Sequence, residues 1–262
     1  MNFPAELQGL RAVPPRTPAT DAVWRGLHAA ACEPYRSAGR FSWHFARGKL
    51  GRDPVFRCLL ERGDLPAQAR VLDIGCGQGL LASLLSSIDD LVQRGGWPAS
   101  WPAAPVAARY TGIELMPRDV QRAETALAAL PRVPHFVCGD MCSAELPASD
   151  VVVILDVLHY VDHAAQEAVL RRVREALAPR GRLLLRVGDA DARRGFVVSQ
   201  WVDRLVTLTR GHRVPPTFGR TLHEWTEVLQ RLGFSVHSVP MSQGTPFANV
   251  LLVADLGDML SP

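Results

Sequence analysis

The feature that most limits the fold is an alternation of short apolar runs with longer amphipathic stretches between residues 69 and 187. Five runs have the length and composition of buried strands: 69–75, 109–115, 134–140, 151–155 and 181–187. The stretches between them carry helical periodicity, over 80–92, 117–130 and 163–178. Strands that alternate with helices form a mostly parallel sheet with helices on both faces. The sequence therefore predicts an α/β fold.

The end of the chain departs from this rhythm. A helix is predicted over 221–234, where Thr221 and Glu224 form a T-x-x-E capping box. Two further strands, 234–240 and 247–256, follow with only a loop between them. Strands joined so closely pair antiparallel. We expect a C-terminal antiparallel hairpin at one edge of a seven-stranded sheet.

Three stretches lie outside the alternation. Residues 1–63 precede the first strand and are expected to form an N-terminal helical segment that covers the core domain, residues 64–262. Residues 94–107 form an insertion rich in Gly, Pro and Trp, and residues 189–220 form a long excursion after the fifth strand. The helix over 163–178 is expected to stop at Pro179, because proline cannot continue a helix.

Composition excludes several classes of protein. The chain is 47% hydrophobic and 21% charged with a net charge of +3, which gives no reason to expect a nucleic-acid or membrane partner. Its five cysteines form no C-x-x-C pair, so neither a disulfide framework nor a metal site is predicted. Reduced thiols and the absence of a signal-peptide pattern favour a cytoplasmic protein. Composition leaves monomer and homodimer open.

The stretch VLDIGCGQG, residues 71–79, is the strongest candidate for a ligand site. Three glycines follow its acid Asp73 at alternate positions: Gly75, Gly77 and Gly79. Glycines at a strand-to-helix turn let the backbone approach a ligand closely. The dinucleotide pattern G-x-G-x-x-G fails because residue 80 is leucine, and Asp73 would repel a pyrophosphate. A cationic ligand without phosphate, such as S-adenosylmethionine (SAM), suits this loop better.

Four motifs in order resemble those of the class I SAM-dependent methyltransferases. VLDIGCGQG is similar to the first motif, YTGIEL to the second, FVCGDMC to the third and DVVVILDVLHYV to the fourth. The resemblance spans roughly residues 69 to 255. It implies a Rossmann-like sheet of seven strands with the C-terminal hairpin, and SAM as the cofactor.

The resemblance also assigns cofactor-binding residues. Asp73 faces the ammonium end, Glu114 the ribose hydroxyls, and Asp140 the adenine amino group. The full expected set is Asp73, Gly75, Cys76, Gly77, Gly79, Glu114, Leu115, Asp140, Met141 and Leu155. One departure is that Glu114 lies 35 residues after Gly79, where about 20 are usual. The insertion at 94–107 accounts for the excess.

The resemblance points to a small-molecule acceptor. The chain lacks the Asn/Asp-Pro-Pro-aromatic motif of adenine and glutamine N-methyltransferases and the Pro-Cys pair of cytosine C5 enzymes. Aromatic residues are frequent in 34–51 and 189–220, which favours an apolar or aromatic acceptor. An acidic substrate or a carrier-protein-bound acyl chain is the alternative, and a non-catalytic SAM-binding protein is the rival class. The N-terminal stretch resembles methyltransferases of pigment or polyketide pathways.

Methyl transfer mainly requires that two reactants are positioned and water is excluded. An oxygen or nitrogen acceptor also needs a base, and histidine has a suitable pKa. His159 is the first candidate, on the turn after the fourth strand, and Tyr160 could orient the acceptor. His44 is the second candidate and His163 the third. The alternative role for His159 is structural, as a side chain that shapes the floor of the SAM site.

Overall fold

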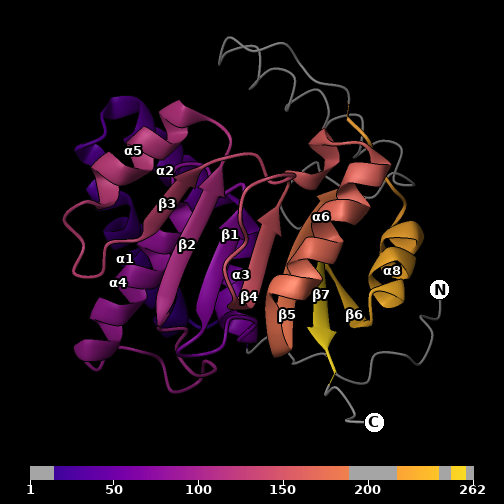
Figure 1. The fold of residues 1–262 in the computed structure, drawn as a ribbon. Helices are drawn as coiled ribbons and strands as arrows, with labels where there is room; N and C mark the ends of the chain where they lie inside the picture. Colours follow the sequence, from indigo (N-terminus) through magenta and orange to yellow (C-terminus); the bar gives the residue numbers. More distant parts are fainter. Residues whose placement is uncertain (1–14, 189–216, 242–248, 258–262) are drawn as a thin grey trace.

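The computed structural model describes residues 15–188, 217–241 and 249–257. Within them, seven strands form one sheet in the order β3-β2-β1-β4-β5-β7-β6 (Figure 1). The strands are β1 Arg70–Ile74, β2 Arg109–Glu114, β3 His135–Cys138, β4 Ser149–Leu155, β5 Leu177–Gly188, β6 Phe234–Pro240 and β7 Asn249–Leu256. Strands β1 to β5 pair in parallel, whereas β7 is antiparallel to both β5 and β6. The predicted α/β sheet and its C-terminal hairpin are confirmed.

Helices cover both faces of the sheet, as predicted. The helical elements are α1 Pro18–Cys32, η1 Glu33–Arg36, α2 Arg40–Arg52, α3 Pro54–Arg62, α4 Leu80–Gln93, α5 Pro117–Leu127, η2 Leu158–Tyr160, α6 His163–Ala176 and α8 Leu222–Arg231. Alternate residues of each strand face opposite sides. Val71 of β1 packs with α1 and α4, while Leu72 packs on the other side with α6 and α8. Figure 1 shows α6 and α8 together on one face.

The N-terminal helices share one hydrophobic core with α4. Trp24 and Leu27 of α1 belong to the buried cluster that contains most of the inner face of α4. The Ser83 hydroxyl in α4 also donates to the Ala31 carbonyl of α1 (2.7 Å). Asp53 caps the start of helix α3, and Gly63, with a φ of +67°, is the cap residue at its end. The division of the chain at residue 63 stays a prediction.

The junction between α6 and β5 differs from the sequence prediction. Helix α6 ends at Ala176 and β5 begins at Leu177, so Pro179 and Gly181 lie inside the strand. A proline disfavours helical backbone in the residue before it, which here is Ala178. The helix therefore ends before the proline rather than at it. Between Ser149 and Val151 the register of β4 and β5 shifts, because the four residues 178–181 are not paired with β4.

The insertion at 94–107 lies at the amino ends of β1 and β2. The Gln68 N–H donates to the Val106 carbonyl (2.7 Å), and the Ala108 N–H donates to the Ala69 carbonyl (3.0 Å). Trp101 is buried in the core beside α4, and its ring stands edge-on to Trp97. The insertion is therefore a packed connection far from the carboxyl ends of the strands. No helix in the described ranges is long and apolar enough to cross a membrane.

Candidate functional site

The glycine loop joins the carboxyl end of β1 to α4. Gly75, Gly77 and Gly79 all have positive φ, at +75°, +55° and +72°. Such backbone is strained for residues with a side chain. The loop is anchored to β2, because the Gly75 and Cys76 N–H groups both donate to the Ile113 carbonyl (2.8 and 3.2 Å).

Packing explains two of these glycines and leaves the third open. A Cβ at Gly75 would lie 2.5 Å from Val157 Cγ1, and one at Gly79 would lie 2.7 Å from the Phe136 ring. Both distances are too short for any real contact. A Cβ at Gly77 would meet nothing within 4 Å. Gly77 is thus the point at which the loop faces open space.

Tyr35 and Asp119, to which the sequence analysis assigned no role, hold this loop from neighbouring elements. The Tyr35 hydroxyl, fully buried in η1, donates to the Gln78 carbonyl (2.8 Å). The Gln78 side-chain amide donates to Asp119 Oδ1 in α5 (3.1 Å). Within the described part of the chain, Gln78 Oε1 is buried and accepts no hydrogen bond. The aromatic N-terminal segment therefore supports the loop, although the sequence signalled only that it was aromatic.

Glu114 ends β2 and points its carboxylate at the loop. Its Oε2 accepts from the Gly77 N–H (2.9 Å), and its Oε1 accepts from the Met116 N–H (2.8 Å). Leu115, the next residue, is 61% exposed although it is large and apolar. The structure thus brings the predicted ribose acid to Gly77, and the residue that follows this acid exposes its apolar side chain.

Asp73 is buried at the end of β1, with only 4% of its surface exposed. The Tyr110 hydroxyl of β2 donates to its Oδ2 (2.6 Å). Burial raises the pKa of Asp73 to about 7; the Tyr110 hydrogen bond opposes that rise, and the Glu114 carboxylate adds to it. Asp73 is therefore a buried acid poised between its neutral and charged forms near neutral pH.

Cys76, one of the predicted cofactor-binding residues, is buried under the loop. A Cβ at Gly112 of β2 would lie 2.6 Å from Cys76 Sγ, so the thiol packs directly over that glycine. Burial raises the pKa of the Cys76 thiol well above its usual value. A buried, protonated thiol is unreactive.

The predicted adenine-side residues lie at the end of β3. Asp140 is exposed, and its Oδ1 accepts from the Cys142 N–H (2.8 Å). Arg172 of α6 donates to the carbonyl of Met141 (2.8 Å), which fixes the turn. Leu155, at the end of β4, is half-buried. Asp140, Met141 and Leu155 thus lie at the carboxyl ends of their strands, on the same edge of the sheet as the glycine loop.

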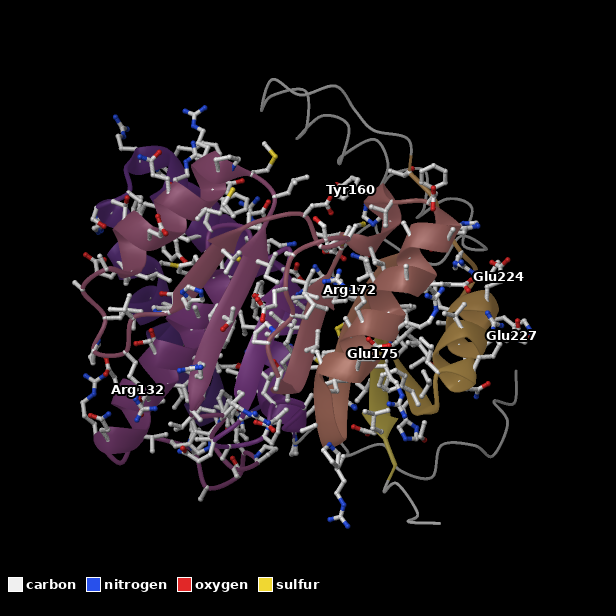
Figure 2. All side chains as sticks on the ribbon, viewed as in Figure 1. Arg132, Tyr160, Arg172, Glu175, Glu224 and Glu227 are labelled. Atoms are coloured by element: carbon white, nitrogen blue, oxygen red, sulfur yellow. The ribbon has the colours of Figure 1, made fainter. Side chains whose placement is uncertain are left out.

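His159 and Tyr160 lie on η2, the short helix after β4. Figure 2 places Tyr160 at the end of the sheet where the parallel strands finish. The two rings are 4.2 Å apart, and the His159 carbonyl accepts from the Phe218 N–H (2.8 Å). Burial lowers the pKa of His159, and the nearby Asp156 carboxylate opposes this. Burial therefore favours the neutral imidazole, the state that a base requires.

The other two histidines have different surroundings. His44 is exposed on α2, where its ring contacts Trp43 at 4.8 Å. His163 begins α6, and its Nε2 lies 3.2 Å from the Gly219 carbonyl. The structure thus places His159 deepest among the three candidates. Most of the excursion at 189–220 lies outside the described residues.

A buried ionic cluster braces the turn that carries His159. Arg186 of β5 is 2% exposed and pairs with both Asp53 and Asp156. Lys49, the only lysine in the chain, lies 2.7 Å from Asp53 and 3.6 Å from Asp156. Burial would raise the pKa of both carboxyls, but Arg186 and Lys49 hold each below its usual range. The cluster joins α2 and α3 to Asp156, a non-glycine residue with φ of +60°.

A hollow of about 600 Å³ lies at the opposite end of β2 and β3. It is lined by one side of α4, from Ala82 to Gln93, and by residues such as Arg109, Arg132 and His135. Arg132 marks that end in Figure 2, far from Tyr160. The hollow is therefore separate from the glycine loop, where the predicted residues gather.

Comparison with known proteins agrees with this geometry. A family model described as a methyltransferase domain matches residues 42–239. Acetylserotonin O-methyltransferase of Mus musculus is 30% identical over 182 residues, which cover 68% of this chain and 42% of that protein. The chain thus spans less than half the length of this curated relative.

Solved structures share the fold at low sequence identity. An O-methyltransferase family protein from Burkholderia thailandensis has a TM-score of 0.59 at 18% identity, over 86% of this chain and 62% of that chain. Magnesium protoporphyrin IX methyltransferase of Synechocystis PCC 6803, solved with bound SAH, has a TM-score of 0.56 at 18% identity, over 91% and 100%. With the matched family model, these findings confirm the resemblance: the chain belongs to the methyltransferase-domain family, the class I SAM-dependent methyltransferases that its motifs predicted.

Proposed function

We propose that this protein transfers the methyl group of SAM to a small apolar or aromatic acceptor. The observation that carries the proposal is the arrangement at the ends of β1 and β2. A loop with three positive-φ glycines opens at Gly77, beside the Glu114 carboxylate and the buried Asp73. An intact loop of this kind favours an enzyme over the non-catalytic alternative.

The residues fit SAM by their chemistry. Within the described part of the chain, the side chains that act on Asp73 are Tyr110 and Glu114, and neither is a cation. Buried acids without a cation suit a ligand that brings positive charge. We assign Asp73 to the ammonium end, Gly75 and Gly77 to the methionine part, and Glu114 with Leu115 to the ribose and adenine side. SAM supplies a methyl group already activated by its sulfonium.

His159 is the proposed base and Tyr160 the orienting group. Both lie on η2, and the Phe218 N–H fixes the His159 backbone. A neutral imidazole at pH 7 can accept a proton from an acceptor hydroxyl or amine. The cluster of Arg186, Asp53 and Asp156 holds the preceding turn, so η2 is positioned from the side of the N-terminal helices.

The acceptor class rests on exposed apolar side chains and on an aromatic residue next to η2. Leu115 and Phe41 are 61% and 53% exposed, and the Phe218 N–H donates to the His159 carbonyl of η2. Similar proteins are named for aromatic acceptors, acetylserotonin and magnesium protoporphyrin IX. We propose that the N-terminal helical segment, within residues 15–63, covers such an acceptor, and that O-methylation of a phenol or an acid is the first activity to test.

The test is transfer of labelled methyl from SAM to a panel of phenols, free acids, carrier-bound acyl chains and hydrophilic amines. We expect a phenol or an apolar acid to be methylated. His159→Gln should lower the single-turnover rate by about 10²–10⁴-fold, the usual contribution of a general base. The exposed His223→Gln is the matched control and should leave the rate unchanged.

The pH profile separates base catalysis from a structural role. Because burial lowers the pKa of His159, the wild-type rate should fall only as the pH drops below about 6.5. That acidic limb should vanish in His159→Gln while SAM affinity is kept. Methylation of a hydrophilic amine alone would overturn the acceptor class, and a normal rate in His159→Gln would overturn the base.

A further inference from the structure

We infer that Tyr110 is a positioning residue for Asp73, and that its hydrogen bond keeps Asp73 ready to meet the cationic end of SAM at neutral pH. The inference rests on the proposed SAM site. Tyr110 is the first residue of the second motif, YTGIEL, but the motif assigns a role only to Glu114, four residues later on β2.

The sheet register explains how the two side chains meet. Val71 of β1 pairs with Tyr110 of β2, so Asp73 pairs with Gly112 two residues further along. Tyr110 and Asp73 are thus diagonal neighbours on one face of the sheet, a separation that aromatic side chains can span. The hydroxyl reaches Asp73 Oδ2 at 2.6 Å.

Gly112 is what makes this diagonal contact feasible. A side chain there would stand directly opposite Asp73, between Tyr110 and the loop. A Cβ at Gly112 would lie 2.6 Å from Cys76 Sγ and 2.9 Å from Phe136 Cδ1. The glycine therefore leaves room for the thiol, and the Phe136 ring stands edge-on to Tyr110 at 6.1 Å. The Tyr110 ring is held by packing, so its hydroxyl has a fixed direction.

The surroundings of Asp73 give this single donor its importance. Four other titratable groups act on Asp73 and Tyr110 or on the Cys76 thiol beside them. They are Glu114 from β2, Cys76 from the loop, Tyr35 from η1 and Asp119 from α5. Asp119 is paired with Arg122 at 2.9 Å. Burial and Glu114 both favour the neutral form of Asp73. Tyr110 is the hydrogen-bond donor that favours the charged form. Without it, more of Asp73 is protonated at pH 7 and cannot face a cation.

The test compares SAM affinity by calorimetry at pH 6, 7, 8 and 9 for wild type and Tyr110→Phe. A charge-assisted hydrogen bond corresponds to a pKa change of about one unit or more. With a wild-type pKa of about 7 for Asp73, a one-unit rise weakens binding about ninefold at pH 6 and about fivefold at pH 7, but by only about 10% at pH 9. The ratio of the two Kd values cancels the titration of SAM's own amino group.

Tyr35→Phe is the matched control. It also removes a buried tyrosine hydroxyl that is bonded to the loop, but that hydroxyl contacts the Gln78 carbonyl rather than Asp73. Its effect on SAM affinity should be the same at every pH. The inference is overturned if Tyr110→Phe binds SAM as wild type does, or weakens binding by one constant factor across the pH range.

A ligand-free measurement separates this inference from the proposed function. Urea unfolding gives the folding equilibrium constant of each protein. The ratio of this constant in Tyr110→Phe to that in wild type should fall by up to about tenfold as the pH rises from 5 to 9. The sign follows because the folded variant holds its Asp73 proton to higher pH. If this loss is seen and wild type does not bind SAM, the proposed function fails. If wild type binds SAM and the loss is absent, the role of Tyr110 fails.

Discussion

Replacing Gly75 with alanine should destabilise the protein by about 1–4.6 kcal/mol. The residue has φ of +75°, and left-handed backbone costs a residue with a side chain about 1–2 kcal/mol. The new Cβ would lie 2.5 and 2.6 Å from the two Cγ atoms of Val157, and such overpacking costs about 1–3 kcal/mol. The lower entropy of the unfolded alanine chain offsets about 0.4–1 kcal/mol of the sum.

Gly77→Ala is the matched control for this prediction. Gly77 has a similar φ of +55°, but a Cβ there meets nothing within 4 Å. Only the backbone cost remains, less the entropy offset, so the loss should be about 0–1.5 kcal/mol. The difference between the two variants therefore isolates the contact with Val157.

Urea unfolding of the ligand-free protein measures both losses from the midpoint and slope of the transition. Adding Val157→Ala to Gly75→Ala should recover about 1–3 kcal/mol relative to the sum of the single changes, because the two side chains would otherwise collide. Equal losses for Gly75→Ala and Gly77→Ala, or strict additivity with Val157→Ala, would refute the packing explanation.

Two further changes test how the site is held. Arg186→Met should lower the free energy of unfolding by about 3–5 kcal/mol, because it removes the guanidinium from two largely buried carboxylates; Arg186→Lys should lose less, and equal losses would count against the paired geometry. The lowered pKa values of Asp53 and Asp156 mean that their contribution is present above about pH 4 and lost as the pH falls, so Arg186→Met should flatten the acid limb of stability against pH. Thr221→Ala should cost about 1 kcal/mol, because Thr221 Oγ1 accepts from the Glu224 N–H at the start of α8; unchanged urea unfolding would show that the cap is not needed.

The sequence was most informative where hydrophobic period and turn chemistry agreed. The apolar runs around 69–75 and 151–155 became adjacent parallel strands, and the T-x-x-E box at Thr221 became the observed cap of α8. The glycines of the loop could be found because their conformation is one that few other residues adopt.

Contacts between distant segments could not be found in this way. Tyr110 meets Asp73 only because the strand register makes them diagonal neighbours, and Arg186 meets Asp53 across 133 positions of sequence. Neither pair has a local pattern. The end of α6 was also predicted wrongly. Pro179 set the last residue that a helix could reach, but a proline disfavours helical backbone in the residue before it, and the helix ends earlier, at Ala176.

The most direct test of the central claim is calorimetric titration of the ligand-free protein with SAM, for wild type and Glu114→Gln. Glu114 is the acid whose carboxylate lies against the Gly77 N–H, where the loop is open. Wild type should bind one SAM per chain. Loss of charge-assisted hydrogen bonds worth about 1.5–3 kcal/mol should weaken binding by about 10- to 150-fold in Glu114→Gln. Glu124→Gln, on the exposed side of α5, should bind as wild type does. No saturable binding by wild type, or equal affinity in Glu114→Gln, would contradict the account.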